Sequence, residues 1–465
     1  MNQNLPSTLG ELKSSGYISK SIKSEIRSNL VKKLGQNDNV FPNIIGFQNT
    51  VIPQIQNAIL AGQDIILLGE RGQAKSRIIR NLLDLLDDKI PYVQGSEIND
   101  DPLNPITSFA KEIIEEKGDS TPIEWLNKEK RYSEKLATPD VSVSDLIGEI
   151  DPIKIAEGRY LSDELAIHYG MIPRGNRGIF CINELPDLTE RIQVSLFNLM
   201  QERDIQIKGF QIRLPLDMLI VATANPEDYT NRGRIITPLK DRYGAQIRTH
   251  YPSSIEEELN IIEQEYTKFD DSENSVLVPE FMREIVAEIT HLSRKSPEIN
   301  QSSGVSLRVS IANYETLISQ SFRRTLITNS NTSPRICDLE FLIPSTMGKV
   351  ELETVEEGQE NSIISNVISR AVLNVFNSKF HLELFDSLIN HFQNGLSIEV
   401  GSEIPESLYL QNIEQITGLS ELLMELGESK EKSIQVSMFE FILEGLHLSK
   451  KLNKNSHQDS DTYSV

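Results

Sequence analysis

Residues 69–76 read Gly-Glu-Arg-Gly-Gln-Ala-Lys-Ser and place Lys75 and Ser76 behind a loop with two glycines. The mostly apolar run 64–68 before the loop predicts a buried parallel strand, and the apolar spacing within 77–87 predicts a helix. A loop at such a junction offers successive backbone N–H groups to an anion, while the lysine reaches the outer phosphates and the hydroxyl ligates Mg²⁺. We therefore predict a phosphate-binding loop here.

One position departs from the usual pattern of such loops, which is G-x-x-x-x-G-K-[ST]. Ala74 stands where the second glycine is expected. If the backbone at this position needs a positive φ, alanine costs about 1 kcal/mol, and if it needs only a small side chain the cost is lower.

A second candidate site follows the apolar run 178–182, which ends in Asn183 and Glu184. In P-loop nucleotide hydrolases an acid at this strand end holds the water shell of Mg²⁺, and the next carboxylate activates the attacking water. Asn183 can accept a hydrogen bond from a metal-bound water but brings no charge, so we expect weaker metal binding and slow hydrolysis. Glu184 is the candidate general base.

Three further residues follow in an order that suits the same site. Asn225 ends the apolar run 217–224, where its side chain would hold the attacking water against the γ-phosphate. Arg242 comes next, and an arginine supplied by a neighbouring subunit raises the rate of such reactions by about 10³–10⁵. Arg308 opens a predicted helix and would touch the phosphates from a lid.

Five elements in this order resemble the AAA+ ATPases, and their details resemble the helix-2-insert clade that includes MoxR proteins and the ATPase subunit of magnesium chelatase. The resemblance covers about residues 41–345. It is carried further by segments that look like the chelatase insert, the approach to Walker B, the helix after it and a following hairpin, which are 146–159, 173–180, 192–202 and 204–214.

The resemblance implies a role for each residue of the site and implies ATP and Mg²⁺ as cofactors. Glu184 would be the Walker B base, Asn225 sensor 1, Arg242 the arginine finger and Arg308 sensor 2, while Asn183 and Ser76 would serve the metal. The implied ATP-binding residues are Ile45 and Gly46 at the adenine and, in Walker A, Gly69, Glu70, Arg71, Gly72, Gln73, Ala74, Lys75 and Ser76. The family also implies a homo-oligomeric ring, expected to be a hexamer, and a partner with a von Willebrand A domain.

Composition narrows the class of protein. With 38% hydrophobic and 25% charged residues the chain is globular, and a formal charge of −22 argues against direct binding to nucleic acid. We expect no membrane span, because no apolar run approaches the roughly 20 residues that one needs, and we expect a cytoplasmic protein. The only cysteines, Cys181 and Cys337, form no metal-binding pattern, and Cys181 is expected to be a buried thiol.

The pattern along the chain predicts an α/β fold: an AAA+ P-loop parallel sheet with helices on both faces, then an all-α lid and extra C-terminal helices. Strands are expected at 64–68, 90–94, 178–183 and 217–224, with a fifth from Ile247. A basic amphipathic helix within 17–34 is expected to dock on the protein or on a neighbouring subunit rather than on a membrane. The predicted divisions are an N-terminal helix region 1–40, a core 41–252 with an insert at about 101–177, a lid 253–345, C-terminal helices 346–454 and a disordered tail 455–465.

Alternative functions stay open at this point. The chain could be a nucleotide-gated scaffold with little hydrolysis, the ATPase subunit of a magnesium-porphyrin chelatase, or a sigma-factor activator, although the loop and DNA-reading module of the last class are not visible. Asp140, Ser142 and Ser144 fit the D-x-S-x-S of a von Willebrand A metal site. Because that fold needs its own sheet, Ser142 and Asp145 are better interpreted as the start of a helix.

Overall fold

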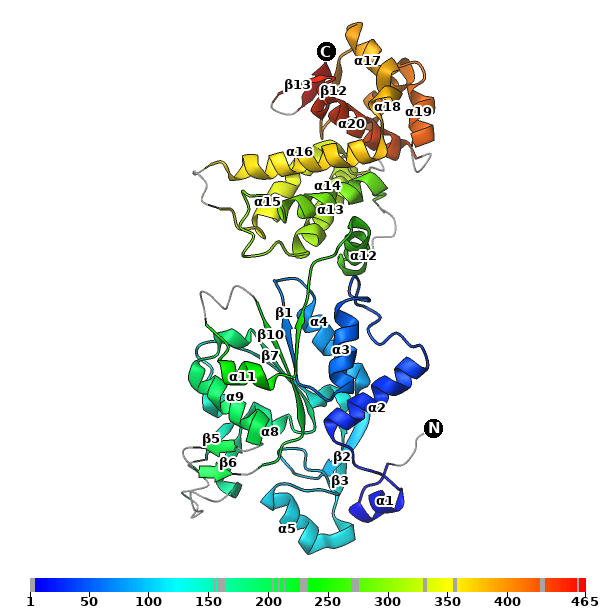
Figure 1. The fold of residues 1–465 in the computed structure, drawn as a ribbon. Coiled ribbons are helices and arrows are strands. Elements are labelled where there is room, and N and C mark those ends of the chain that lie inside the picture. Colours follow the sequence, from blue (N-terminus) through cyan, green and yellow to red (C-terminus); the bar gives the residue numbers. More distant parts are fainter. Residues whose placement is uncertain are drawn as a thin grey trace. The chain divides into compact units, whose positions relative to one another are not determined.

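The chain divides into two compact units, residues 1–250 and 251–465 (Figure 1). The boundary lies close to the one predicted at residue 252. The structure, a computed structural model, describes residues 5–151, 153, 156, 164–202, 205–207, 210–212, 214–225, 233–268, 276–328, 333–353, 358–426, 431–457 and 460–465.

The first unit is built on a five-stranded sheet with the order β11-β1-β10-β7-β4, in which every pair of neighbours is parallel. Helices α2, α3 and α4 lie on one side of this sheet, and α8, α9 and α11 lie on the other (Figure 1). The expected α/β class with helices on both faces is confirmed. The strands of the sheet are β1 (Ile65–Leu68), β4 (Tyr132–Leu136), β7 (Gly178–Asn183), β10 (Met218–Ala224) and β11 (Ala245–Arg248).

The helices of this unit are short. Most of them either cover one face of the sheet or lie in the segments that connect its strands. They are α1 (Leu9–Ser14), α2 (Ile22–Gly35), α3 (Val51–Leu60), α4 (Lys75–Asn81), α5 (Ser108–Lys117), α6 (Val143–Leu146), α8 (Met171–Arg174), α9 (Glu190–Glu202) and α11 (Thr237–Arg242). The helix expected over 77–87 is instead α4 followed by a 3₁₀ turn at Leu82–Leu85.

Alternation along the strands explains why the sheet is covered twice. Ile65 and Leu67 pack with the apolar side chains of α2, α3 and α4, whereas Ile66 packs on the opposite face, in the cluster that holds α9 and α11. Successive side chains of a strand point to opposite faces, so a continuous apolar run supplies two cores. The basic helix α2 docks on the body of the unit through Ile22, Ile26 and Leu30, each at most 1% exposed.

The strand predicted at 90–94 was assigned to the wrong sheet. It is β2 (Lys89–Val93), which pairs antiparallel with β3 (Ile123–Asn127), while β4 takes the edge of the parallel sheet. The sequence of β4, Tyr-Ser-Glu-Lys-Leu, is too polar to indicate a strand of a parallel sheet from apolar content alone.

The residues expected as one insert at 101–177 therefore lie on both sides of β4. Before it come α5 and β3, and after it come α6, β5 (Gly148–Ile150), β6 (Ile167–Tyr169) and α8. Ser142 and Asp145 form the predicted capping box at the start of α6. Within the chelatase-like segment 146–159, residues 152, 154, 155 and 157–159 lie outside the described residues. The hairpin predicted at 204–214 is confirmed as β8 (Ile205–Ile207) paired with β9 (Phe210–Ile212).

The second unit is helical and has one shared core. Its helices are α12 (Ile255–Glu265), α13 (Glu280–Ser293), α14 (Arg308–Thr328), α15 (Ile343–Met347), α16 (Glu360–Lys379), α17 (Asp386–Gln393), α18 (Glu406–Gln415), α19 (Leu419–Leu426) and α20 (Lys432–Leu448). A 3₁₀ stretch, Ile336–Leu342, precedes α15. Gly418, with φ 81°, separates α18 from α19.

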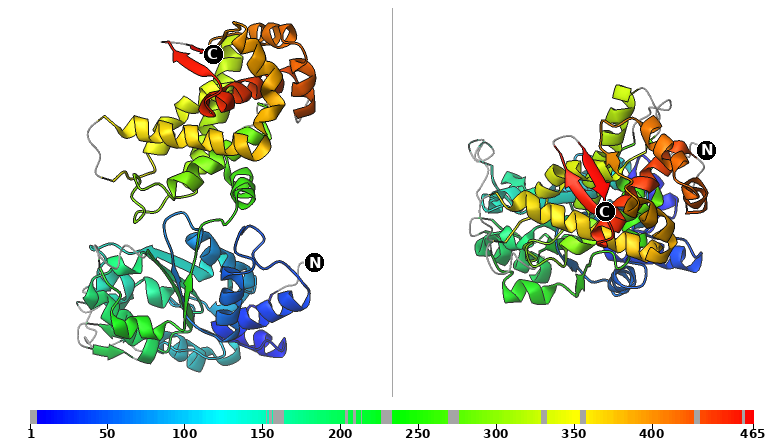
Figure 2. Two further views of the ribbon diagram at one scale, coloured as in Figure 1. Left: turned by 45° about the horizontal axis from the view of Figure 1, so that its top comes forward. Right: turned by 90° about the horizontal axis from the view of Figure 1, so that it is seen from above.

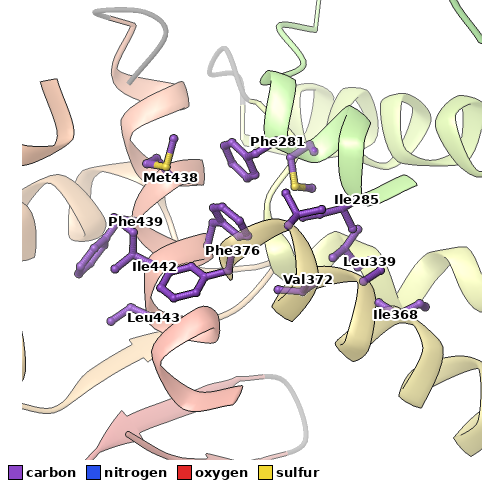
Figure 3. Close-up of a cluster of buried hydrophobic side chains, with 14 of the residues drawn as sticks. Phe281, Ile285, Leu339, Ile368, Val372, Phe376, Met438, Phe439, Ile442 and Leu443 are labelled. Atoms are coloured by element: carbon purple, nitrogen blue, oxygen red, sulfur yellow. The ribbon is translucent and has the colours of Figure 1, made fainter. Parts of the chain in front are cut away.

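The predicted lid and the C-terminal helices are not separate domains. Phe281 of α13 stacks on Phe441 of α20 with ring centroids 4.4 Å apart, and Figure 3 shows side chains of α13, α16 and α20 meeting in this cluster. Gly445 permits the close approach of α20 and α16, since a Cβ there would lie 2.2 Å from Phe376. The sequence of an amphipathic helix does not show which other helix its apolar face packs against. The lid and the C-terminal helices were therefore predicted as separate regions.

The C-terminal residues were expected to be disordered, and this expectation is wrong for those that the structure describes. Strands β13 (Asn453–Ser456) and β14 (Asp461–Ser464) form a hairpin that pairs with β12 (Ile398–Val400), and the hairpin is visible in both views of Figure 2. Tyr463 is buried against α20, where its hydroxyl bonds Glu444. Backbone pairing and one buried aromatic ring order a segment whose composition is polar.

Among the described residues, no helix is both long enough and apolar enough to cross a membrane.

Candidate functional site

The loop 69–74 joins β1 to α4 as predicted, and its backbone explains two of its residues. Ala74 has φ 53° and ψ 15°, so the left-handed conformation that glycine would adopt freely is imposed on an alanine. Gly69 is needed because a Cβ there would lie 1.9 Å from Thr249 Oγ1 and 2.3 Å from Gln73 Oε1. The loop is therefore tightly packed where it leaves the strand.

Lys75 is buried in the loop that it follows. Its ammonium donates hydrogen bonds to the carbonyl of Gly69, to the carbonyl of Glu70 at 2.9 Å and to Asn225 Oδ1 at 2.8 Å. Lys75 and Asn225 are 150 residues apart in sequence, and the pairing of β1 with β10 brings them together at the carboxyl edge of the sheet. Ser76 lies in the first turn of α4 and is exposed.

A hydrogen bond between the side chains of Gln73 and Thr249 spans the loop. The sequence did not predict this contact. Gln73 Oε1 accepts hydrogen bonds from the Glu70 backbone N–H at 3.1 Å and from Thr249 Oγ1 at 2.7 Å. Thr249 follows β11, and its backbone N–H donates to the carbonyl of Leu68 at 2.8 Å. A threonine after a short strand carries no pattern that would have indicated this contact.

The second strand end, that of β7, lies beside β10 in the sheet. Glu184 has φ 57°, and its backbone N–H donates to Thr223 Oγ1 at 3.1 Å. Thr223 Oγ1 in turn donates to Asn183 Oδ1 at 3.3 Å. A left-handed residue at the end of a buried strand is the kind of strained backbone that is common at functional sites.

Glu134 is a polar residue of this region that the sequence did not single out. Its Oε1 accepts a hydrogen bond from Asn183 Nδ2, and its Oε2 accepts from Arg80 Nη2 at 3.0 Å and from the Tyr132 hydroxyl at 3.0 Å. In the sequence Glu134 is only a carboxylate within a short polar segment. Its link to Asn183 becomes clear once β4 is known to pair with β7. Nearby Cys181 is buried as predicted, and burial raises the pKa of its thiol to about 12.

Arg242 ends α11 and lies against α9. Its guanidinium donates to Gln201 Oε1 at 2.6 Å and to Asp241 Oδ2 at 3.0 Å, and its Cζ lies 5.2 Å from the centre of the Phe197 ring. Its side chain is 34% exposed, so contact with another molecule is open to it.

The remaining predicted residues stay predictions in their roles. Ile45 and Gly46 precede α3, and Gly46 has φ 83°. Arg308 opens α14 in the second unit, where it is exposed and its backbone N–H donates to Ser306 Oγ at 3.1 Å.

The oxygen atoms at this sheet edge suit a magnesium-bound nucleotide. Mg²⁺ takes oxygen ligands, keeps several waters and is usually bound through one or two protein groups together with substrate phosphates. The hydroxyl of Ser76, the amide oxygen of Asn183 and the carboxylates of Glu134 and Glu184 are of the required type. Lys75 supplies the positive charge that phosphates require.

Comparison with known proteins gives relatives that align with about half of the chain. The chain is 27% identical over 266 residues to the magnesium-chelatase subunit ChlI of Nostoc sp., and 28% identical over 253 residues to a magnesium-chelatase subunit ChlI homolog of Methanocaldococcus jannaschii. These alignments cover 56% and 51% of this chain and 65% and 64% of the relatives, so the chain spans slightly less than two thirds of the length of each relative.

A solved structure titled as the complex between subunits BchI and BchD of magnesium chelatase aligns with 69% of this chain and 98% of its own, at 20% identity and a TM-score of 0.36. A superposition of that quality defines no residue equivalences. No family model matches the chain.

The P-loop at the end of β1, the strand order of the parallel sheet and the ChlI relatives agree with one another. The chain therefore has an α/β fold of the AAA+ kind and is similar in sequence to magnesium-chelatase subunits of the ChlI type.

Proposed function

We propose that the first unit binds ATP with Mg²⁺ and hydrolyses it. The observation that carries this proposal is the contact between Lys75 Nζ and Asn225 Oδ1, because it joins the P-loop to the strand that should hold the attacking water. Thr223, two residues before Asn225 on the same strand, contacts both Asn183 and Glu184. The proposed phosphate-binding and hydrolytic residues thus meet along one edge.

Each residue has a proposed role. Residues 69–76 bind the phosphates, with Lys75 neutralising their charge, and Ile45 and Gly46 contact the adenine. Ser76 and Asn183 hold the metal and its waters, which when bound would neutralise charge on the β- and γ-phosphates. Glu184 accepts the proton of the attacking water, and Asn225 orients that water.

A nucleotide-binding assay and a steady-state ATPase assay test the proposal on the full chain. Lys75→Ala should abolish nucleotide binding, and Glu184→Gln should bind ATP but lose nearly all turnover, since a missing general base costs about 10²–10⁴ in rate. Glu190→Gln, at the exposed start of α9, is the matched control for the loss of a carboxylate. Nucleotide binding unaffected by Lys75→Ala would refute the proposed site.

The chain is further proposed to act as a motor in a homo-oligomeric ring, with six subunits expected, and to remodel a protein partner that carries a von Willebrand A domain. Support comes from the ChlI relatives and from Arg242, which is part-exposed at the end of α11. In such a ring, Arg242 of one subunit completes the site of the next. For Arg308 the proposed role is that of sensor 2, which rests on the family resemblance.

Mixing two inactive variants tests the ring. Arg242→Ala subunits retain a nucleotide site but donate no arginine, while Lys75→Ala subunits donate the arginine but bind no nucleotide. Mixed assemblies should recover ATPase activity, because some interfaces then combine an intact site with an intact Arg242. Activity that stays at the level of the separate variants at every mixing ratio would contradict a site shared between subunits.

A scaffold that binds nucleotide but hardly hydrolyses it is the second candidate, and the neutral side chain of Asn183 favours it. In that case ATP should change the oligomeric state while the turnover of the natural chain equals that of Glu184→Gln. The names of the relatives favour a third candidate, the ATPase subunit of a magnesium-porphyrin chelatase. Magnesium insertion into a porphyrin by the chain with its partner subunits would distinguish that function.

A further inference from the structure

We propose that Glu134 is a positioning residue for the magnesium-bound nucleotide: it supplies, from the neighbouring strand, the carboxylate that Asn183 lacks, and it fixes the orientation of the Asn183 carboxamide. This inference rests on the proposed nucleotide site. The juxtaposition that carries it is the hydrogen bond from Asn183 Nδ2 to Glu134 Oε1 between two parallel strands.

The strand register explains how the two side chains meet. In the pairing of β4 with β7, Glu134 lies opposite Cys181 and Leu136 lies opposite Asn183. Side chains two residues apart on a strand share a face of the sheet, so Glu134 and Asn183 are diagonal neighbours on one face. Cys181, on that same face, packs in the apolar cluster that includes residues of α4, the helix after the P-loop.

The partners of the Asn183 amide set its orientation. A carboxylate only accepts hydrogen bonds, so the NH₂ group must point to Glu134 and the oxygen must point away from it. The oxygen then accepts from Thr223 Oγ1 at 3.3 Å and lies 3.5 Å from Cys181 Sγ. An oxygen held toward β10 is suited to accept from a metal-bound water.

The same geometry explains why residue 183 is an amide rather than an acid. An aspartate there would face Glu134 at hydrogen-bonding distance, where two carboxylates repel each other and neither can donate a hydrogen bond to the other. An asparagine beside a glutamate instead forms a hydrogen bond, so this strand end keeps one carboxylate. The departure at Walker B is a displacement of the charge, not its loss.

Other contacts hold the Glu134 side chain in place. Arg80 and Tyr132 both bind Oε2, so Oε1 is the atom directed to Asn183. Arg80 is 63% exposed, and an ion pair in that setting is strongly screened by water. Ser76 lies one helical turn before Arg80 on α4, and residues four apart share a helix face.

Affinity for a fluorescent ADP derivative, measured with Mg²⁺ and with EDTA, tests the proposal on the full chain without relying on turnover. The quantity compared is the ratio of the two affinities. Glu134→Gln should lower this ratio by about tenfold or more, the usual effect of losing a group that supports a metal ligand, while affinity in EDTA stays the same. Glu129→Gln, an exposed glutamate just before β4, is the matched control and should change neither value.

Moving the carboxylate from residue 134 to residue 183 is a sharper test of the proposal. Asn183→Asp alone should not raise the ratio, because its carboxylate faces Glu134, whereas Glu134→Gln combined with Asn183→Asp should restore the ratio to within about threefold of the natural chain. If Glu134→Gln does not fold, Asn183→Ala replaces it and should lose the same Mg²⁺ effect.

Three outcomes would overturn the inference. Glu134→Gln, or its replacement Asn183→Ala, could match the Glu129→Gln control, or the double variant could show only the summed loss of the single changes. A natural chain that binds no ADP under either condition would refute the proposed nucleotide site and this inference with it. Binding that depends on Lys75 but not on Glu134 would refute the inference alone.

Discussion

The ammonium of Lys75 lies 2.8 Å from the side-chain oxygen of Asn225 and connects the end of β1 with the end of β10. Both strands are parallel and neighbouring, so their carboxyl ends must open on the same edge of the sheet. In open α/β sheets, ligands bind at the carboxyl ends of the strands. The contact lies at that edge, where we propose that the phosphates of a nucleotide bind.

Replacing Asn225 by alanine should affect ATP hydrolysis much more than nucleotide binding. We expect Asn225→Ala to lower ATP turnover by about 10²-fold, the scale of losing one oriented polar group in a reacting site, and to change ADP affinity by less than about threefold. Steady-state ATPase rates and ADP titrations check both values. A proportional loss of affinity and turnover would mean that Asn225 only holds Lys75.

Replacing Ala74 by glycine should stabilise the first unit. Because Ala74 has φ 53°, glycine relieves backbone strain, and we expect the free energy of unfolding to rise by up to about 1 kcal/mol. Urea unfolding followed by the fluorescence of Trp125, the single tryptophan, reports on this unit. Ala61→Gly is the control, since φ is −83° there and glycine should destabilise slightly.

The buried ion pair of Glu25 and Arg131 should be costly to break. It joins α2 to the segment before β4 through two contacts of 2.6 Å, with both residues at most 3% exposed. Glu25→Gln should lower the free energy of unfolding by about 3–5 kcal/mol, because it leaves Arg131 as an uncompensated buried charge. Converting both residues to methionine should recover most of that loss.

Trp125 fluorescence in urea checks these variants as well. Lys13→Met, which breaks an exposed pair with Asp119, should leave the midpoint unchanged. An equally small effect of Glu25→Gln would show that the docking of α2 does not depend on the buried pair.

Acid should weaken the second unit through Glu258. Burial raises the pKa of this carboxyl, but the contact with His291 Nε2 at 2.8 Å, the charge of Arg294 and the hydroxyl of Ser310 lower it by more, so the net pKa lies below the ordinary 4.5. A carboxyl whose pKa is lower in the folded state than in the unfolded state stabilises the folded state at pH values above its unfolded pKa. That contribution is therefore complete above pH 4.5 and is lost as the pH falls through the folded pKa.

Hydrogen exchange of amides in α12, α13 and α14, corrected for the intrinsic pH dependence, measures this loss. Glu258→Gln should lower protection at neutral pH and remove most of the acid-dependent part. Glu263→Gln, an exposed partner of Lys268, should keep the pH profile of the natural chain. A natural chain whose protection is constant below pH 4.5 would contradict the assignment to Glu258.

The sequence alone determined the parts of this protein that depend on local pattern. The P-loop follows a glycine-bearing motif, and strands β1, β7 and β10 follow continuous apolar runs, because such runs must be buried on both faces of a parallel sheet. The capping box at Ser142 follows from two residues three apart. The family resemblance also came from motifs of this kind.

Only the tertiary structure decided which segments far apart in the chain meet. It assigned the polar strand β4, not β2, to the sheet edge, and thereby brought Glu134 to Asn183. It also showed that the polar C-terminal residues pair with β12 and that the lid and the C-terminal helices share one core. Backbone pairing and the fit of apolar faces depend on partners that no local pattern names, and this is the physical reason why these features could not be predicted from the sequence.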